Sequence, residues 1–168
     1  ALPFLSRVTH AAVVSCDALF SIPDFRMNER VFALLLALRA KAEKTFLIQT
    51  RMPEIPLWRE SVRGNISDFY REELAKRKEF GYPPFTILIK ISSNGKEAAV
   101  AKEMALVETL FREYSPIIYP ARKNFGRAEV TMRALLKIAV PWPDQKLRAL
   151  LGSLPPSLEV RVDPEDTL

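Results

Sequence analysis

The first third of the chain places one amphipathic segment between two short apolar runs. Residues 8–16 (VTHAAVVSC) and 45–50 (TFLIQT) are rich in apolar, β-branched and aromatic side chains, which predicts two buried strands. Between them, apolar residues recur at helical spacing from Val31 to Ala42, and Asp24 is a residue type that caps helices. The proline-bearing residues 51–58 are predicted to form an irregular connector. This order predicts strand, helix and strand, a piece of an α/β sheet.

A second amphipathic segment follows the connector. Residues 65–80 fit a helix that Ser67 caps, with Phe69 and Leu74 on its buried side and Glu73 among the residues left to solvent. A glycine and two consecutive prolines follow it, which predicts that the helix ends there.

The rest of the chain predicts six alternating elements. They are strand, helix, strand, strand, helix and strand, at residues 85–92, 97–114, 117–119, 134–140, 144–154 and 158–162. Lys90 interrupts the otherwise apolar first strand of this series. The order of elements suits a ferredoxin-like β-α-β-β-α-β sandwich.

Composition favours a folded, soluble protein of a reducing compartment. The 168 residues are 48% hydrophobic and 27% charged, which is typical of a globular chain with its own core. Cys16 is the one cysteine and His10 the one histidine, so we expect no disulfide framework and no metal site of these residue types. We also expect no membrane span, because no apolar run approaches 18 residues.

Catalysis is difficult to assign to these residues. The sequence contains neither a G-x-x-x-x-G-K-[ST] nor a G-x-G-x-x-G phosphate loop. Cys16 and His10 are six positions apart, and a buried cysteine is more often a core residue than a nucleophile. No carboxylate stands in an apolar setting with a partner that would raise its pKa. We therefore expect no complete active site and no cofactor in this chain.

Nucleic-acid binding is better supported, because cations gather in one stretch. The net charge is +5, and residues 121–137 carry five bases against one acid, whereas residues 157–168 carry four acids against one base. Cations can bind phosphates and an aromatic face can stack on an unpaired base. The candidates in this stretch are Arg122, Lys123, Phe125, Arg127, Arg133 and Lys137. An ordinary solvated basic loop is the alternative interpretation.

Two further candidates lie outside this basic stretch. Tyr82, in the segment Tyr82-Pro83-Pro84-Phe85, is either a stacking platform for a base or part of a packed corner. Arg77 is either a phosphate contact or the partner of Glu73 on its own helix.

Several motifs in one order resemble the C-terminal third of the bacterial primosomal replication-restart helicases, the family of primosomal protein N′. They are Ile22-Pro23-Asp24-Phe25-Arg26, Glu29-Arg30, Ile48-Gln49-Thr50, Phe69-Tyr70 with Glu73-Leu74 and Arg77, Tyr82-Pro83-Pro84-Phe85, Tyr119-Pro120, Gly126 with Arg133, Leu135-Leu136-Lys137 and Val162-Asp163-Pro164. The resemblance implies that residues 1–58 are the end of the second RecA-like helicase lobe. It implies that residues 59–168 are the C-terminal DNA-binding domain of a cytoplasmic bacterial protein.

The family's last helicase motif is eroded in this chain. Where the family has A-G-R-A-G-R, the chain reads Arg39-Ala40-Lys41-Ala42-Glu43-Lys44, so we expect Ala40 and Ala42 to extend the preceding helix. Lysine does not present the planar fork of an arginine finger to a developing phosphoryl charge. The resemblance places the ATP and zinc sites of the family upstream of Ala1. These departures predict a degenerate member that has lost ATP-dependent unwinding and has kept DNA binding.

Two functions remain open at this point. The first is a non-catalytic module that binds single-stranded or branched DNA. The second is a protein-interaction module, in which Lys146 and Arg148 beside a leucine-bearing helix face hold the acidic tail of the single-stranded-DNA-binding protein, with other primosome components as further partners.

Overall fold

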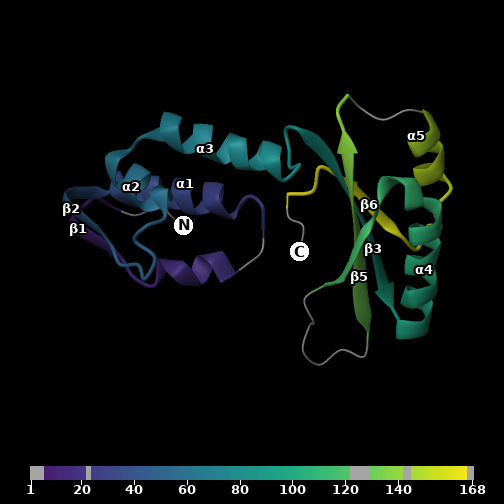
Figure 1. The fold of residues 1–168 in the computed structure, drawn as a ribbon. Coiled ribbons are helices and arrows are strands. Elements are labelled where there is room, and N and C mark those ends of the chain that lie inside the picture. Colours follow the sequence, from purple (N-terminus) through teal and green to yellow (C-terminus); the bar gives the residue numbers. More distant parts are fainter. Residues whose placement is uncertain (1–5, 22–23, 122–128, 142–144, 166–168) are drawn as a thin grey trace. The chain divides into compact units, whose positions relative to one another are not determined.

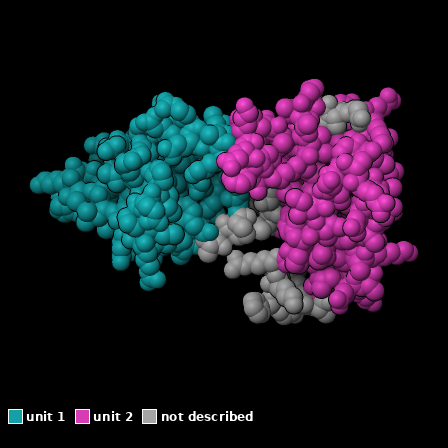
Figure 2. Space-filling view, viewed as in Figure 1, with its two compact units in different colours: residues 1–76 teal, residues 77–168 magenta. Residues whose placement is uncertain are grey.

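The structure is a computed structural model that describes residues 6–21, 24–121, 129–141 and 145–165. It is a mixed α/β structure with two sheets (Figure 1). The chain divides into two compact units, unit 1 at residues 1–76 and unit 2 at residues 77–168, which Figure 2 colours separately. The predicted domain assignment, with its boundary after residue 58, concerns evolutionary origin and stays a prediction.

Unit 1 is built on a two-stranded parallel sheet. Its elements are β1 (Val8–Val13), η2 (Cys16–Ser21), α1 (Met27–Arg39), β2 (Ala42–Ile48), α2 (Pro56–Arg63) and most of α3 (Ile66–Glu79). Because parallel strands need a crossover connection, α1 carries the chain from the end of β1 back to the start of β2. The predicted strand, helix and strand are therefore confirmed, although the first strand ends at Val13 and not at residue 16.

Aromatic side chains dominate the core of unit 1. The rings of Phe32 and Phe69 stack with centroids 3.8 Å apart and an interplanar angle of 9°. The indole of Trp58 is buried and donates a hydrogen bond to the carbonyl of Met52 at 2.8 Å. Cys16 is 1% exposed in the same cluster, so the expectation of a core cysteine is confirmed.

Helix boundaries in unit 1 differ from the prediction at two places. Ala40 ends α1 and Ala42 begins β2, so the expectation that these alanines extend the helix is wrong. Pairing with β1 outweighs the high helix propensity of alanine here. Residues 51–58 are predicted to be an irregular connector, but α2 begins within them at Pro56. Proline is tolerated there, since the first helical turn does not need its missing amide hydrogen.

The cap and the buried face of α3 also differ from the prediction. Asn65, and not Ser67, accepts a hydrogen bond from the amide of Asp68 at 3.3 Å, and Ser67 lies inside the helix. Glu73 is 5% exposed and accepts a hydrogen bond from Asn28 of α1 at 3.1 Å, whereas Leu74 is 40% exposed. The polar partner on α1 compensates the burial of the carboxylate.

Unit 2 contains a four-stranded antiparallel sheet in the order β4-β5-β3-β6. Its elements are β3 (Thr86–Gly95), α4 (Glu97–Leu110), η3 (Arg112–Tyr114), β4 (Ile117–Pro120), β5 (Val130–Ala139), α5 (Gln145–Gly152) and β6 (Glu159–Val162). The six predicted elements are found in the predicted order, with β5 starting four residues earlier than expected.

Helices α4 and α5 lie on one face of this sheet (Figure 1). Alternate residues of the central strands, such as Ile89, Ile91 and Leu136, meet Val107 of α4 in a core where all four are 0% exposed. Because side chains alternate along a strand, the intervening residues lie on the opposite face of the sheet. In the part of the chain that the structure describes, no helix is long and apolar enough to cross a membrane.

Candidate nucleic-acid interface

The predicted basic loop is only partly described by the structure. Arg122, Lys123, Phe125 and Arg127 lie outside the described residues, so their assignment stays a prediction. Arg133 and Lys137 both lie on β5, four residues apart and therefore on the same face of the sheet.

That face is the one opposite α4 and α5. The register pairs Lys137 with Leu88, Arg133 with Tyr119 of β4, and Lys90 with Arg161 of β6. Directly paired residues of an antiparallel sheet project to the same side. The sheet thus brings four cations and a tyrosine to one face, which we call the cationic face: Lys90, Arg133, Lys137, Arg161 and Tyr119.

Lys137 is held by the turn that precedes β3. Its ammonium lies 3.9 Å from the centroid of the Tyr82 ring and donates a hydrogen bond to the carbonyl of Phe80 at 2.8 Å. Desolvation lowers the pKa of Lys137, while the ring face and the carbonyl favour its charged form. Tyr82 therefore acts here as the packed-corner interpretation expects, and its assignment to base stacking stays a prediction.

Arg133 has unused hydrogen-bonding capacity. Its Nε and Nη1 atoms are buried and have no hydrogen-bond partner among the described residues. A buried polar group without a partner is unusual in a folded protein, since it carries a desolvation cost. We therefore expect a hydrogen-bond acceptor beside the guanidinium of Arg133, which the strand register places opposite Tyr119.

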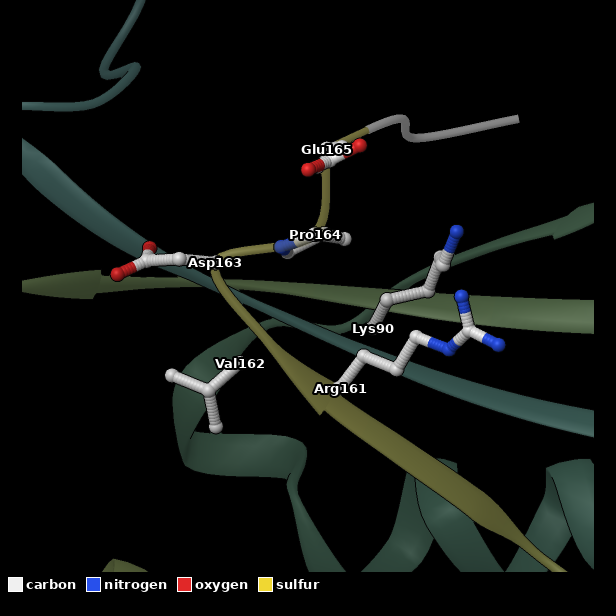
Figure 3. Close-up of a pocket in the computed structure, with 6 residues that line it drawn as sticks. All are labelled: Lys90, Arg161, Val162, Asp163, Pro164 and Glu165. Carbon is white, nitrogen blue, oxygen red and sulfur yellow. The ribbon is translucent and has the colours of Figure 1, made fainter.

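Lys90 and Arg161 are site residues that the sequence analysis did not assign. Figure 3 shows their side chains running next to one another from neighbouring strands, in a pocket beside Asp163, Pro164 and Glu165. The available signal was Lys90 interrupting an apolar strand. Its partner could not be found from the sequence, because the register between β3 and β6 joins residues 71 positions apart.

The remaining predicted binding residues lie away from this face or have other contacts. Arg77 is half-buried near the end of α3, and its carbonyl accepts a hydrogen bond from the amide of Tyr82 at 2.8 Å. On α5, the ammonium of Lys146 is 2.5 Å from a carboxylate oxygen of Glu113, and Arg148 is exposed.

The leucines of the predicted docking helix pack against the core and are buried or partly buried. Leu147 is 0% exposed in the core, and Leu150, Leu151 and Leu154 pack against the same core. The leucine side of this segment thus faces mostly the core, and docking of a partner beside Lys146 and Arg148 stays a prediction.

The residues of the eroded helicase motif serve the fold of unit 1. Arg39 donates a hydrogen bond from Nε to the carbonyl of Val62 at 2.8 Å, near the C-terminal end of α2. The carbonyl of Lys41 accepts a hydrogen bond from the amide of Val8 at 2.9 Å, and Lys44 is exposed on β2. A cation near a helix C-terminus is favourable because it interacts with unpaired carbonyls there.

Metal and thiol chemistry find no support in the described part of the chain. Among the residues described, no group of three or more histidine, cysteine or acidic side chains could hold a metal ion. His10 is exposed on β1, and burial raises the pKa of the Cys16 thiol, which disfavours the reactive thiolate.

Comparison with known proteins identifies the relatives of the chain. It is 28% identical over 130 residues to the replication restart protein PriA of Borreliella burgdorferi, covering 74% of this chain. It is 27% identical over 164 residues to PriA of Thermotoga maritima, covering 88% of this chain, and 35% identical over 112 residues to PriA of Chlamydia trachomatis, covering 63%. The chain is therefore similar to PriA proteins.

This relationship confirms the resemblance that the motifs predict. The chain spans only a part of these PriA proteins, namely 19%, 22% and 15% of the length of the three relatives in the order given. No family model matches the chain.

Proposed function

We propose that this chain is a DNA-binding module of a replication-restart protein, which binds single-stranded or forked DNA and has no ATPase activity of its own. The observation that carries the proposal is the similarity to PriA proteins over up to 88% of the chain. The name of those proteins assigns them to replication restart. We propose that the module corresponds to their C-terminal part and acts in the bacterial cytoplasm.

The cationic face supplies the chemistry for this binding. Its lysines and arginines attract phosphates, and two buried nitrogens of the planar Arg133 guanidinium have no hydrogen-bond partner among the described residues. Tyr119, paired with Arg133 across the strands, is a candidate for stacking on an unpaired base. A surface that combines cations with an aromatic ring favours single strands, whose bases are unstacked and accessible.

The folds we propose for the two parts follow the strand arrangement. For residues 59–168 we propose a ferredoxin-like domain, which the observed order β4-β5-β3-β6 and the alternation of strands and helices support. For residues 1–58 we propose a remnant of a RecA-like helicase lobe, which the parallel pairing of β1 and β2 through α1 supports.

Titration of single-stranded DNA into the full chain tests the proposal. Fluorescence anisotropy of a labelled oligothymidylate should report binding that weakens linearly on a log–log plot against salt concentration. If five phosphates are contacted, the slope should be about −3.5 on a single strand. The matched variants are Arg133→Gln, on the cationic face, and Lys102→Gln, which removes one exposed cation from α4. A chain that shows no salt-dependent binding would overturn the proposal.

The absence of ATP hydrolysis is tested separately. The chain carries no phosphate loop, and Arg39 of the eroded motif is bound to the carbonyl of Val62. We therefore expect the purified chain to hydrolyse ATP at the background rate with or without single-stranded DNA. Hydrolysis that rises on addition of DNA would contradict this part of the proposal.

Docking of an acidic peptide on α5 is a second candidate function. The observation in its favour is that the Lys146–Glu113 ion pair is exposed, with 61% and 46% of the two side chains accessible. Such a pair contributes little to stability, so an acidic tail such as that of the single-stranded-DNA-binding protein can replace Glu113 at low cost. Titration of that peptide without DNA, against the chain and a Lys146→Gln variant, separates this binding from the binding of DNA.

A further inference from the structure

One row of side chains crosses the four-stranded sheet of unit 2. The register places Arg133 of β5 between Tyr119 of β4 and Ser92 of β3. On the next strand, Glu159 of β6 is opposite Ser92. Directly paired residues of an antiparallel sheet project to the same side, so these side chains all lie on the cationic face. We call them the polar row.

Arg133 brings hydrogen-bond donors that have no acceptor. Its Nε and Nη1 atoms are buried and lack a partner among the described residues. Leaving a buried donor unpaired is costly, which favours a ligand that supplies an acceptor here. Because the guanidinium is planar and its donors are fixed in a fork, two acceptors in one plane suit it best.

Glu159 brings an acceptor at the opposite end of the row. Its Oε1 accepts a hydrogen bond from Nε of Arg161 at 2.8 Å and lies 2.6 Å from Nη2 of the same residue. The second oxygen, Oε2, makes no hydrogen bond to the residues that the structure describes. A ligand can therefore use Oε2 while the pair with Arg161 stays intact.

The charges of the row favour a neutral ligand over a phosphate. Arg133 is positive and Glu159 is negative, so a phosphate between them would be attracted by one and repelled by the other. A nucleobase carries no net charge and presents donors and acceptors around the edge of one plane. Tyr119 is next to Arg133 and belongs to the residue class on which unpaired bases stack.

Guanine matches this order of groups. Its O6 and N7 atoms accept hydrogen bonds, and an arginine or lysine that donates to both is the commonest base-specific contact. Its N1–H and N2 amino groups donate, and a carboxylate can accept from both. Neighbouring strands lie about 4.8 Å apart, so Arg133 and Glu159 are separated by about 10 Å at the backbone, which two long side chains and a purine can span. Adenine has an amino group in place of O6, so it would face the guanidinium with another donor.

We propose that the polar row binds one guanine base of single-stranded DNA. Arg133 donates to O6 and N7, and Glu159 accepts from N1 and the N2 amino group. Tyr119 stacks on the ring, and the register puts the hydroxyl-bearing Ser92 between the two charged residues. This inference rests on the proposed function and names the base that the cationic face selects.

The test measures binding of the full chain to two short strands by fluorescence anisotropy. One is a labelled oligothymidylate, and the other is the same strand with a single central guanine. The guanine strand should bind roughly fivefold tighter, the lower end of the discrimination that one bidentate contact gives. Because both strands carry the same number of phosphates, contacts to the backbone cancel in the ratio of the two dissociation constants.

Two modified bases identify the atoms that are recognised. 7-Deazaguanine lacks the N7 acceptor offered to Arg133, and hypoxanthine lacks the N2 amino group offered to Glu159. Each modified strand should lose part of the guanine preference of the unsubstituted chain. This measurement needs no variant, so it decides the inference even where a substitution prevents folding.

Matched variants assign the preference to residues. Arg133→Lys keeps the charge but not the planar fork, so it should keep the salt slope and lose most of the preference for guanine over thymine. Glu159→Gln should weaken the preference and the difference between guanine and hypoxanthine. Lys102→Gln and Glu108→Gln change charges on α4 and should leave the preference unchanged. Circular dichroism establishes that each variant is folded.

The outcomes separate the inference from the proposed function. If the full chain binds neither strand, the proposed function fails and the inference fails with it. If it binds both strands equally, the inference is overturned and the proposed function stands. A preference that 7-deazaguanine and hypoxanthine keep in full would come from stacking alone and would also overturn the inference. A preference that folded Arg133→Lys and Glu159→Gln both retain would place the guanine elsewhere and overturn it.

Discussion

The contact of Lys137 with the turn before β3 predicts a measurable loss of stability. Lys137→Met removes the ammonium that lies 3.9 Å from the Tyr82 ring centroid and 2.8 Å from the Phe80 carbonyl. A partly desolvated cation–π contact contributes about 1–2 kcal/mol, and a hydrogen bond from a charged donor about 1.5–3 kcal/mol. Removing the charge also relieves the desolvation that lowers the pKa of Lys137. We therefore expect a net destabilisation of unit 2 by about 2 kcal/mol.

A double-mutant cycle separates the ring contact from the other effects. Urea unfolding is measured for the full chain, Lys137→Met, Tyr82→Leu and the double variant. If the two units unfold in separate transitions, the transition of unit 2 is the one that shifts. The coupling free energy between the two positions should be about 1 kcal/mol, the size expected for residues in contact. Lys102→Met on α4 is the control and should change stability by less than about 0.5 kcal/mol.

Two results would refute this reasoning. A coupling free energy below about 0.3 kcal/mol would mean that the ring and the ammonium do not stabilise one another. A Lys137→Met variant as stable as the control would mean that the turn is held by other contacts. The Lys137→Met variant also tests the predicted role of Lys137 in DNA binding. If Lys137 contacts a phosphate, the slope of the logarithm of DNA affinity against the logarithm of salt concentration should be smaller in magnitude by about 0.7 in the folded variant.

Three other predictions concern stability. Arg39→Ala should destabilise unit 1 by about 1 kcal/mol in urea unfolding through loss of one hydrogen bond at the end of α2, whereas the exposed Lys44→Ala should have little effect; equal effects would contradict this role of Arg39. Phe69→Ala should cost about 3–5 kcal/mol by removing the ring stacked on Phe32, and a cost below about 1 kcal/mol would mean that the stack contributes little. Hydrogen bonds from the hydroxyls of Ser157 and Ser93 lower the pKa of the Glu103 carboxyl from its ordinary value of 4.5. The contribution of this ionised carboxylate to the stability of the fold is therefore present above pH 4.5 and is lost as pH falls through the lowered pKa. Glu103→Gln should therefore unfold with a weaker acid dependence than the unsubstituted chain, and an unchanged dependence in thermal melts between pH 5 and about pH 2 would contradict this cause.

Hydrophobic periodicity predicted those parts of the fold in which one face of an element is buried against one core. Val107 of α4 and the C-cap residue Phe111 lie four residues apart, and both are 0% exposed in the structure. Short apolar runs likewise located the strands of both sheets. Such patterns report which side of an element faces the core, so they predict element type better than element ends.

The errors arose where a tertiary contact outweighs a local preference. Leu74 fits the apolar side of α3 by spacing, yet it is 40% exposed, and the neighbouring Glu73 is buried because Asn28 of another helix donates a hydrogen bond to it. Pro56 was interpreted as a mark of irregular structure, although proline is accommodated in a first helical turn. The burial of Glu73 depends on another helix, whereas the position of Pro56 follows a local rule for the first helical turn.

The candidate site was harder to predict than the fold for a related reason. Charge clustering along the sequence indicated the stretch from Arg122 to Lys137, and it led to Arg133 and Lys137 on the cationic face. It could not indicate Lys90 and Arg161, because their proximity is created by strand pairing. A lone charge in an apolar strand is a useful signal, but its meaning depends on the residue that the register places opposite.

The cations of the described residues are used in different ways. In unit 1, Arg39 of the eroded helicase motif is bound by a backbone carbonyl at the end of α2, so its donor is used within the fold. In unit 2, Arg133 keeps two donors without partners among the described residues. Charge that stabilises a fold is expected to find partners within it, whereas charge kept for a ligand retains unsatisfied donors or repulsion. By this criterion Arg133 of the cationic face is suited to a ligand, whereas Arg39 and Lys137, which donate to the carbonyls of Val62 and Phe80, serve the fold.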